Sequence, residues 1–81
     1  MAQFFHVQLI IPDDPAAAWV RTLSRSDIMH LVDSQGTPIY LPPCLRWWAS
    51  ERHAPENEFQ AEYGPHDDDD FLKHSYKAKA L

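Results

Sequence analysis

The segment FFHVQLII, residues 4–11, constrains the fold more than any other, because its apolar residues recur at every second position. In an extended chain, successive side chains point to opposite faces. One face of this segment is wholly apolar, with Phe5, Val7, Leu9 and Ile11, and the other face is mixed. The pattern predicts a strand of an antiparallel sheet whose first face meets the core and whose second face is partly solvated.

Residues 14–24 carry signals that are typical of a helix. The aspartates at 13 and 14 can cap its N-terminus, and Pro15 suits the first helical position. The apolar residues at helical spacing are Ala16, Val20 and Leu23. We therefore expect a helix with one apolar stripe over residues 14–24.

The next part of the chain resembles two strands joined by a turn. Residues 28–33 are rich in strand-forming residues, and residues 37–41 follow after the turn sequence DSQG, in which Gly36 can adopt a positive φ angle. This order predicts a β-hairpin. Residues 44–49 are compatible with either a strand or a helix. Leu45 and Trp48 fit a helical stripe, but the two adjacent tryptophans favour a strand, and we expect a strand here.

Together these elements predict an α+β fold in the order β-α-β-β, with a possible further strand. The sheet would be small and mainly antiparallel, with one packed helix and an irregular acidic C-terminal segment. We expect an α+β core domain at residues 1–53, an acidic irregular segment at 54–70 and a short basic tail at 71–81. Pro55, Gly64 and Pro65 interrupt regular structure in the acidic segment.

The chain length bounds the size of the protein's core. Eighty-one residues make at most one domain, and 44% of them are apolar, which suffices for a folded core. Because so short a chain buries a modest share of its surface, we expect self-association as a homodimer. Cys44 is the single cysteine, so it forms no intramolecular disulfide, and we expect it to be a small buried residue.

Residues 1–11 lack the basic start of a signal peptide, and no apolar stretch reaches the length of a membrane span. With one cysteine and no disulfide framework, the cytoplasm is the compartment that we expect. The chain has only two glycines and no glycine-rich phosphate loop or nucleophile elbow. We therefore expect a non-enzymatic protein without a cofactor.

The formal charge of −5 is unevenly distributed. Residues 51–70, called the acidic window below, hold eight carboxylates and one cation, Arg52, a net charge of −7. The three lysines of residues 71–81 follow it. Direct binding of nucleic acid by the whole domain is not expected, because phosphate contacts need concentrated lysine and arginine.

The acidic window predicts a surface that docks a basic partner. Carboxylates steer such a partner, and aromatic residues anchor it. The steering residues are Glu56, Glu58, Glu62, Asp67, Asp68, Asp69 and Asp70, and the anchors are Trp47, Phe59 and Tyr63. The partner would be a basic protein surface, including that of a nucleic-acid-binding protein, since a carboxylate string can occupy a groove built for phosphates. The alternatives are a solvated loop without a partner and a metal site.

The metal alternative is a small metal-binding protein or metal-dependent enzyme that uses His66 with Asp68 and Asp70, or His6 with His30. Oxygen ligands at such density attract hard divalent cations, but consecutive residues of an extended chain point in opposite directions. His6 and His30 both fall on predicted strands and could share one sheet face. No metal-binding spacing such as HxH or HExxH occurs. A protein-binding module, namely an accessory subunit, regulator or inhibitor, is therefore the preferred prediction.

Overall fold

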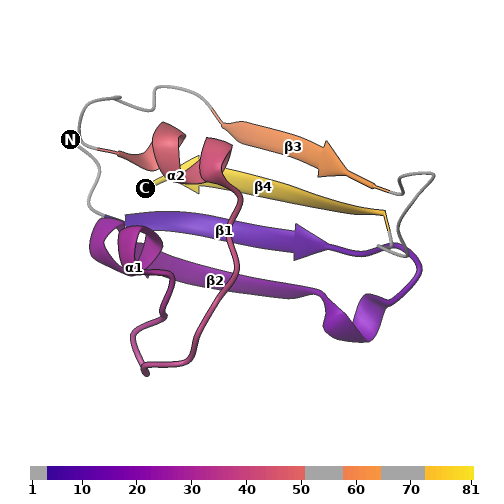
Figure 1. Ribbon diagram of the computed structural model, residues 1–81, viewed down its shortest axis with the longest axis horizontal. Helices are drawn as coiled ribbons and strands as arrows, with labels where there is room; N and C mark the ends of the chain where they lie inside the picture. The colour runs from indigo at the N-terminus through magenta and orange to yellow at the C-terminus, as the bar shows by residue number, and fades with distance from the viewer. Residues whose placement is uncertain (1–3, 51–57, 65–72) are drawn as a thin grey trace.

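The computed structural model describes residues 4–50, 58–64 and 73–81. In this part of the chain, four strands form one antiparallel sheet in the order β2-β1-β4-β3, and two helices cover one of its faces (Figure 1). The elements in chain order are β1 (Phe4–Ile10), a 3-10 helix (Pro15–Ala17), β2 (Trp19–Ser24), α1 (Arg25–His30), α2 (Pro43–Ala49), β3 (Phe59–Tyr63) and β4 (His74–Ala80). The general prediction of a small α+β fold with an antiparallel sheet is confirmed, although the predicted element order is wrong.

Strand β1 is the element that the sequence predicts best. Phe5, Val7 and Leu9 are buried, while Phe4 and His6 are exposed, as the alternation requires. β1 lies between β2 and β4 and pairs antiparallel with both. Among the described residues, no helix covers the side of β1 that carries the exposed His6, and this side is called the open face of the sheet below.

The helix predicted at residues 14–24 is wrong. The proline at position 15 starts only a three-residue 3-10 helix, and Ala18 is already extended. Residues 19–24 then form β2, because Val20 and Thr22 are β-branched and suit a strand paired with β1. Leu23 is buried and lies opposite Phe5, which fixes the register of the pair.

The predicted strand at 28–33 is also wrong, because the helix α1 begins at Arg25 and continues to His30. Ser24 accepts a hydrogen bond from the Asp27 N–H at 3.0 Å, and Asp27 accepts one from the Ser24 N–H at 3.0 Å. This capping box nucleates α1, which places Ile28 in the core. The turn at DSQG is present, with Gly36 at a φ angle of 81°, but residues 37–41 contribute only an isolated bridge from Pro38 to Val32.

Residues 44–49 are helical rather than extended, so the preferred strand prediction is wrong here too. Pro43 occupies the start of α2, where its missing N–H leaves no donor unsatisfied. Trp48 is 8% exposed and packs against the Phe5 ring at 5.5 Å, whereas Trp47 is 63% exposed. Helical geometry thus separates the two tryptophans, one inside and one outside.

The C-terminal part of the chain is more regular than the sequence suggests. Residues 59–63, predicted as irregular, form β3, and residues 74–80, predicted as a basic tail, form β4. β4 inserts between β1 and β3, so the last strand of the chain lies at the centre of the sheet (Figure 1). The stretches 51–57 and 65–72 lie outside the described residues.

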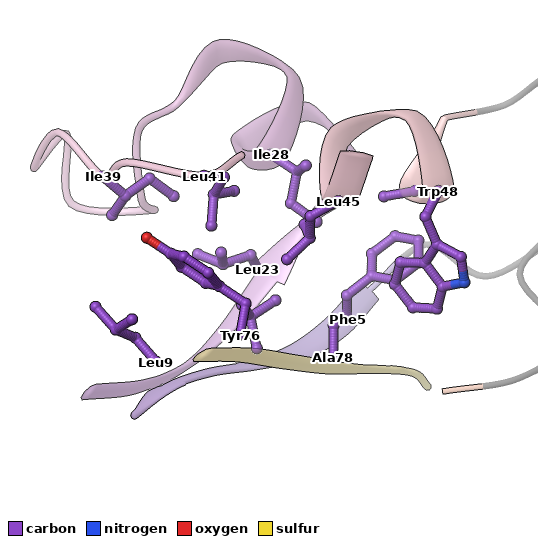
Figure 2. Packing of buried hydrophobic residues seen from close by; sticks show 12 residues of the cluster. Phe5, Leu9, Leu23, Ile28, Ile39, Leu41, Leu45, Trp48, Tyr76 and Ala78 are labelled. Carbon is purple, nitrogen blue, oxygen red and sulfur yellow. The ribbon is translucent and has the colours of Figure 1, made fainter. Parts of the chain in front are cut away.

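The hydrophobic core lies between the sheet and the helical layer (Figure 2). Leu45 of α2 and Ile28 of α1 point down onto Phe5, Leu23 and Ala78 of the sheet (Figure 2). Each large aliphatic or aromatic side chain buried in this way contributes about 1.5–3 kcal/mol to stability. None of the helices within the described ranges is long and apolar enough to cross a membrane.

Candidate functional site

Strand β3 forms one edge of the sheet, since its only described neighbour is β4. The side to which each residue of β3 turns its N–H and C=O groups can be derived from one backbone hydrogen bond between β1 and the residue after β4. The Leu81 N–H donates to the Phe4 carbonyl at 3.0 Å, so Phe4 turns its N–H and C=O towards β4. In an antiparallel ladder, successive residues turn these groups to opposite sides.

The same alternation, followed from β1 through β4 to β3, shows which backbone groups of β3 have no partner on β4. Phe59, Ala61 and Tyr63 pair with Ala78, Tyr76 and His74 and turn their backbone groups inward. Gln60 and Glu62 therefore turn their N–H and C=O groups away from β4. No described residue bonds to these four groups. Within the described part of the chain, the outer side of β3 is thus an unpaired strand edge.

The two described carboxylates of the acidic window lie at this edge. Glu58 immediately precedes β3, and Glu62 is within it on the face of the sheet that no described helix covers. Both side chains are exposed, and neither forms a hydrogen bond or ion pair in the described part of the chain. Their charges are therefore available to a cation on a partner.

Two of the three predicted aromatic anchors, Phe59 and Tyr63, lie on the other face of β3 and are partly buried. Phe59 packs against the Trp48 ring at 5.7 Å, and Tyr63 stacks on His74 at 5.5 Å with an interplanar angle of 24°. Much of their surface is therefore used within the chain. Trp47 of α2 has the most exposed ring among the three predicted anchors. The structure thus places the carboxylates and the half-buried rings on opposite faces of β3, although they were predicted to form one surface.

Tyr63 belongs to a polar and aromatic cluster that the sequence pattern does not indicate. Its hydroxyl lies 2.6 Å from the Cys44 Sγ, and its ring contacts the Tyr76 ring at 6.2 Å. Cys44 is exposed, so its prediction as a buried residue is wrong. His74 and Tyr76 occupy alternate positions of β4 on the helical side, and this period-two spacing is the signal that could have placed them there.

Two tyrosines of this cluster have raised pKa values. Burial, followed by the hydrogen bond with Cys44, raises the pKa of Tyr63 from 10.0 to about 12. Burial raises the pKa of Tyr76 to about 12 as well, and its hydroxyl donates to the Tyr40 carbonyl at 3.2 Å. Both phenols therefore remain neutral at physiological pH, and their hydrogen bonds with Cys44 and Tyr40 hold β3 and β4 to the layer above them.

The predicted metal ligands receive no support from the described residues. His6 is exposed on the open face of β1, whereas His30 lies on α1, on the other side of the sheet, where its Nδ1 lies 2.9 Å from the Ser26 carbonyl. The prediction that both lie on strands sharing one face is wrong. No group of three metal-ligating side chains occurs within residues 4–50, 58–64 and 73–81.

Several predicted site residues lie outside the described part of the chain. These are the partner-binding residues Glu56, Asp67, Asp68, Asp69 and Asp70, together with His66 of the alternative metal site. Their roles stay predictions.

The chain matches no protein-family model, and neither the curated proteins nor the solved structures contain one significantly similar to it. Its function therefore has to be inferred from its own residues.

Proposed function

We propose that this protein is a small non-enzymatic binding module that docks a basic segment of another protein at the outer edge of β3. The observation that supports this most is the coincidence of free backbone groups and free carboxylates at one edge. Gln60 and Glu62 turn their N–H and C=O groups outward, and Glu58 and Glu62 are exposed and unpaired in the described residues. A basic partner strand would satisfy both sets of groups.

Charge across the sequence supports a basic partner. The acidic window carries a net charge of −7, and β3 lies within it. Like charges on β3 disfavour pairing of this edge with the same edge of a second copy. A lysine- or arginine-rich strand places opposite charges beside Glu62 instead, where a cross-strand pair stabilises the complex.

The biological role consistent with this edge is that of an accessory subunit, regulator or inhibitor. Occupation of a nucleic-acid-binding groove is one form of this role, because the acidic window offers carboxylates where a polynucleotide offers phosphates. The expected partner is therefore a basic surface, such as that of a nucleic-acid-binding protein. The homodimer and the cytoplasmic location stay predictions from the sequence.

The probe for this proposal is the capped peptide acetyl-Lys-Val-Lys-Val-Lys-Val-amide. It favours an extended conformation, and the lysine ammonium groups are its only charged groups. Its affinity should fall as NaCl rises through the physiological range, because exposed charges are screened there. Replacing both carboxylates in Glu58→Gln/Glu62→Gln should weaken binding about tenfold at low salt, since two exposed ion pairs contribute up to about 1 kcal/mol each.

The matched control is Asp13→Asn/Asp14→Asn, which removes two exposed carboxylates from the connection between β1 and β2. It changes the net charge by the same amount at a place separated from β3 across the sheet, because β4 lies between β1 and β3. Equal weakening by both double variants would mean that overall charge attracts the peptide without a specific edge. No weakening by either would contradict the proposal.

A further inference from the structure

The opposite edge of the sheet, on β2, also has free backbone groups. Phe5, Val7 and Leu9 turn their N–H and C=O groups towards β2, where they pair with Leu23, Arg21 and Trp19. Val20 and Thr22 therefore turn theirs outward, and no described residue bonds to these four groups. The same alternation directs the Ser24 N–H outward, where the Asp27 carboxylate accepts it at 3.0 Å.

A polar groove of about 360 Å³ runs beside this edge. One wall is the strand itself, with Arg21 and Thr22, and the other is the turn after α1, with Asp33, Gln35 and Thr37. The chain between α1 and α2 extends past β2 on the side of its free edge (Figure 1). The groove thus exposes the unpaired side of a strand to solvent.

Hydrogen bonds around Asp33 fix the outer wall. Its Oδ1 accepts from the N–H groups of Gln35 and Thr37 at 2.9 and 2.8 Å, and its carbonyl accepts from the Gly36 N–H at 3.0 Å. Its Oδ2 lies 3.2 Å from Nη1 of Arg21, which ties this wall to β2. A wall held in this way is already ordered, so binding of a ligand loses little conformational entropy there.

The β2 edge lacks the features that normally keep a sheet edge from pairing. It has no proline, lysine or bulge, and Val20 is 53% exposed. The only charged side chain of β2 is that of Arg21, whose guanidinium lies over the Trp19 ring at 5.0 Å and pairs with Asp33. This charge is therefore engaged within the chain rather than used to repel a neighbouring strand.

We propose that the outer edge of β2 binds one extended polypeptide segment of another protein, with uncharged polar side chains facing the turn at residues 33–37. The segment would exchange hydrogen bonds with the backbone of Val20 and Thr22 as a fifth strand. Arg21 and Asp33 neutralise each other, and the remaining polar groups of the wall, on Ser34, Gln35 and Thr37, suit hydroxyl or amide side chains.

The position of the turn favours a single strand over a second copy of this chain. The groove has room beside β2, but the segment between α1 and α2 projects beyond that edge (Figure 1). A second copy paired through its own β2 would bring its own segment between α1 and α2 to this edge, whereas a single strand brings no such segment. This binding site does not depend on the acidic window or on the function proposed for β3.

The probe is the neutral capped peptide acetyl-Ser-Val-Thr-Val-Ser-Val-amide, titrated into isotopically labelled protein and followed by NMR and amide hydrogen exchange. We expect saturable shifts at Val20 and Thr22 and slower exchange of their amides, with little dependence on salt. Thr22→Pro removes one outward donor without breaking a bond to β1 and should weaken binding about tenfold. Gln60→Pro, the matched change on the β3 edge, should leave binding unchanged.

Three outcomes would overturn this proposal. The first is peptide-induced protection at Gln60 and Glu62 in place of Val20 and Thr22. The second is protection of Val20 and Thr22 that rises with protein concentration without peptide, which would assign the edge to a second copy. The third is an unchanged exchange rate at both residues up to millimolar peptide. The wild-type measurement decides among them even where Thr22→Pro fails to fold.

Discussion

The Nε of Arg25 in α1 donates a hydrogen bond to the Ala49 carbonyl at the end of α2, over a distance of 2.8 Å. Arg46 of α2 reciprocates, because its Nη2 donates to the Met29 carbonyl in α1 at 3.2 Å. Each helix thus supplies a cation to the C-terminal turn of the other, where the helix dipole favours positive charge. This exchange joins two helices that are too short to be stable alone.

Removal of the Arg25 guanidinium should therefore destabilise the fold. Arg25 is 8% exposed, and its guanidinium also lies over the Phe5 ring at 5.6 Å. Arg25→Met keeps most of the aliphatic volume but leaves a buried carbonyl without its donor, which costs about 1–3 kcal/mol. Urea denaturation measures this loss. Arg21→Met, which breaks a partly exposed ion pair, should cost less than about 1 kcal/mol, and the reverse order would contradict the assigned roles.

The adjacent tryptophans should respond oppositely to truncation. Trp48→Ala leaves a cavity between Phe5 and Phe59 and should lower the unfolding free energy by about 3–5 kcal/mol. Trp47→Ala should change it by about 0.5 kcal/mol, because that ring is 63% exposed. Thermal and urea unfolding of the two variants test the placement of both rings on α2. Equal losses would mean that α2 is rotated or extended.

Alkaline pH should destabilise the protein through Tyr63 and Tyr76. Both phenols ionise near pH 10 when unfolded, while their folded pKa values are raised to about 12, chiefly by burial. Their contribution is therefore fully present below pH 10 and is lost as pH rises from 10 to 12. Tyr76→Phe should make this loss shallower, at a cost of about 1 kcal/mol at neutral pH from the lost bond to Tyr40.

The alkaline experiment is urea unfolding at a series of pH values from 8 to 12. The Tyr63→Phe/Tyr76→Phe variant should show the smallest dependence on pH. An unchanged slope in that variant would mean that other groups cause the alkaline loss.

Gly36 should tolerate a methyl group sterically but not conformationally. Its φ angle is 81°, and a Cβ built there meets no atom within 4 Å. Gly36→Ala should therefore lower stability by about 1–2 kcal/mol, because the left-handed backbone disfavours residues with a side chain. Gly36→Asn should lose less, since asparagine tolerates this conformation. Equal losses in the two variants would mean that the turn does not keep its positive φ angle.

The sequence is informative where a pattern is both local and unambiguous. The alternation in β1 predicts its buried face correctly, and DSQG predicts the turn. The capping residues Ser24 and Asp27 were equally local, yet the strand-forming residues after them concealed the start of α1. For residues 14–24, Pro15 begins a helical turn that the pairing of β2 with β1 then ends, so tertiary pairing overrides the local signal.

The candidate site was harder to predict because it depends on contacts between distant parts of the chain. β4 contains two lysines and two alanines, which have low strand propensity, and it is extended because β1 and β3 pair with it on both sides. The carboxylates at positions 58 and 62 were identified from composition alone. Their separation from the rings of Phe59 and Tyr63 required the strand alternation of β3, which a sequence read as irregular could not show.

The most direct test of the binding edge is amide hydrogen exchange along β3, with and without acetyl-Lys-Val-Lys-Val-Lys-Val-amide. In the free protein, the amides of Gln60 and Glu62 should exchange faster than that of Ala61, because Ala61 alone of these three turns its N–H towards β4. Added peptide should slow exchange at Gln60 and Glu62 specifically, and salt should reverse the effect. Exchange that stays unchanged at these two residues while the peptide binds elsewhere would contradict the proposed function.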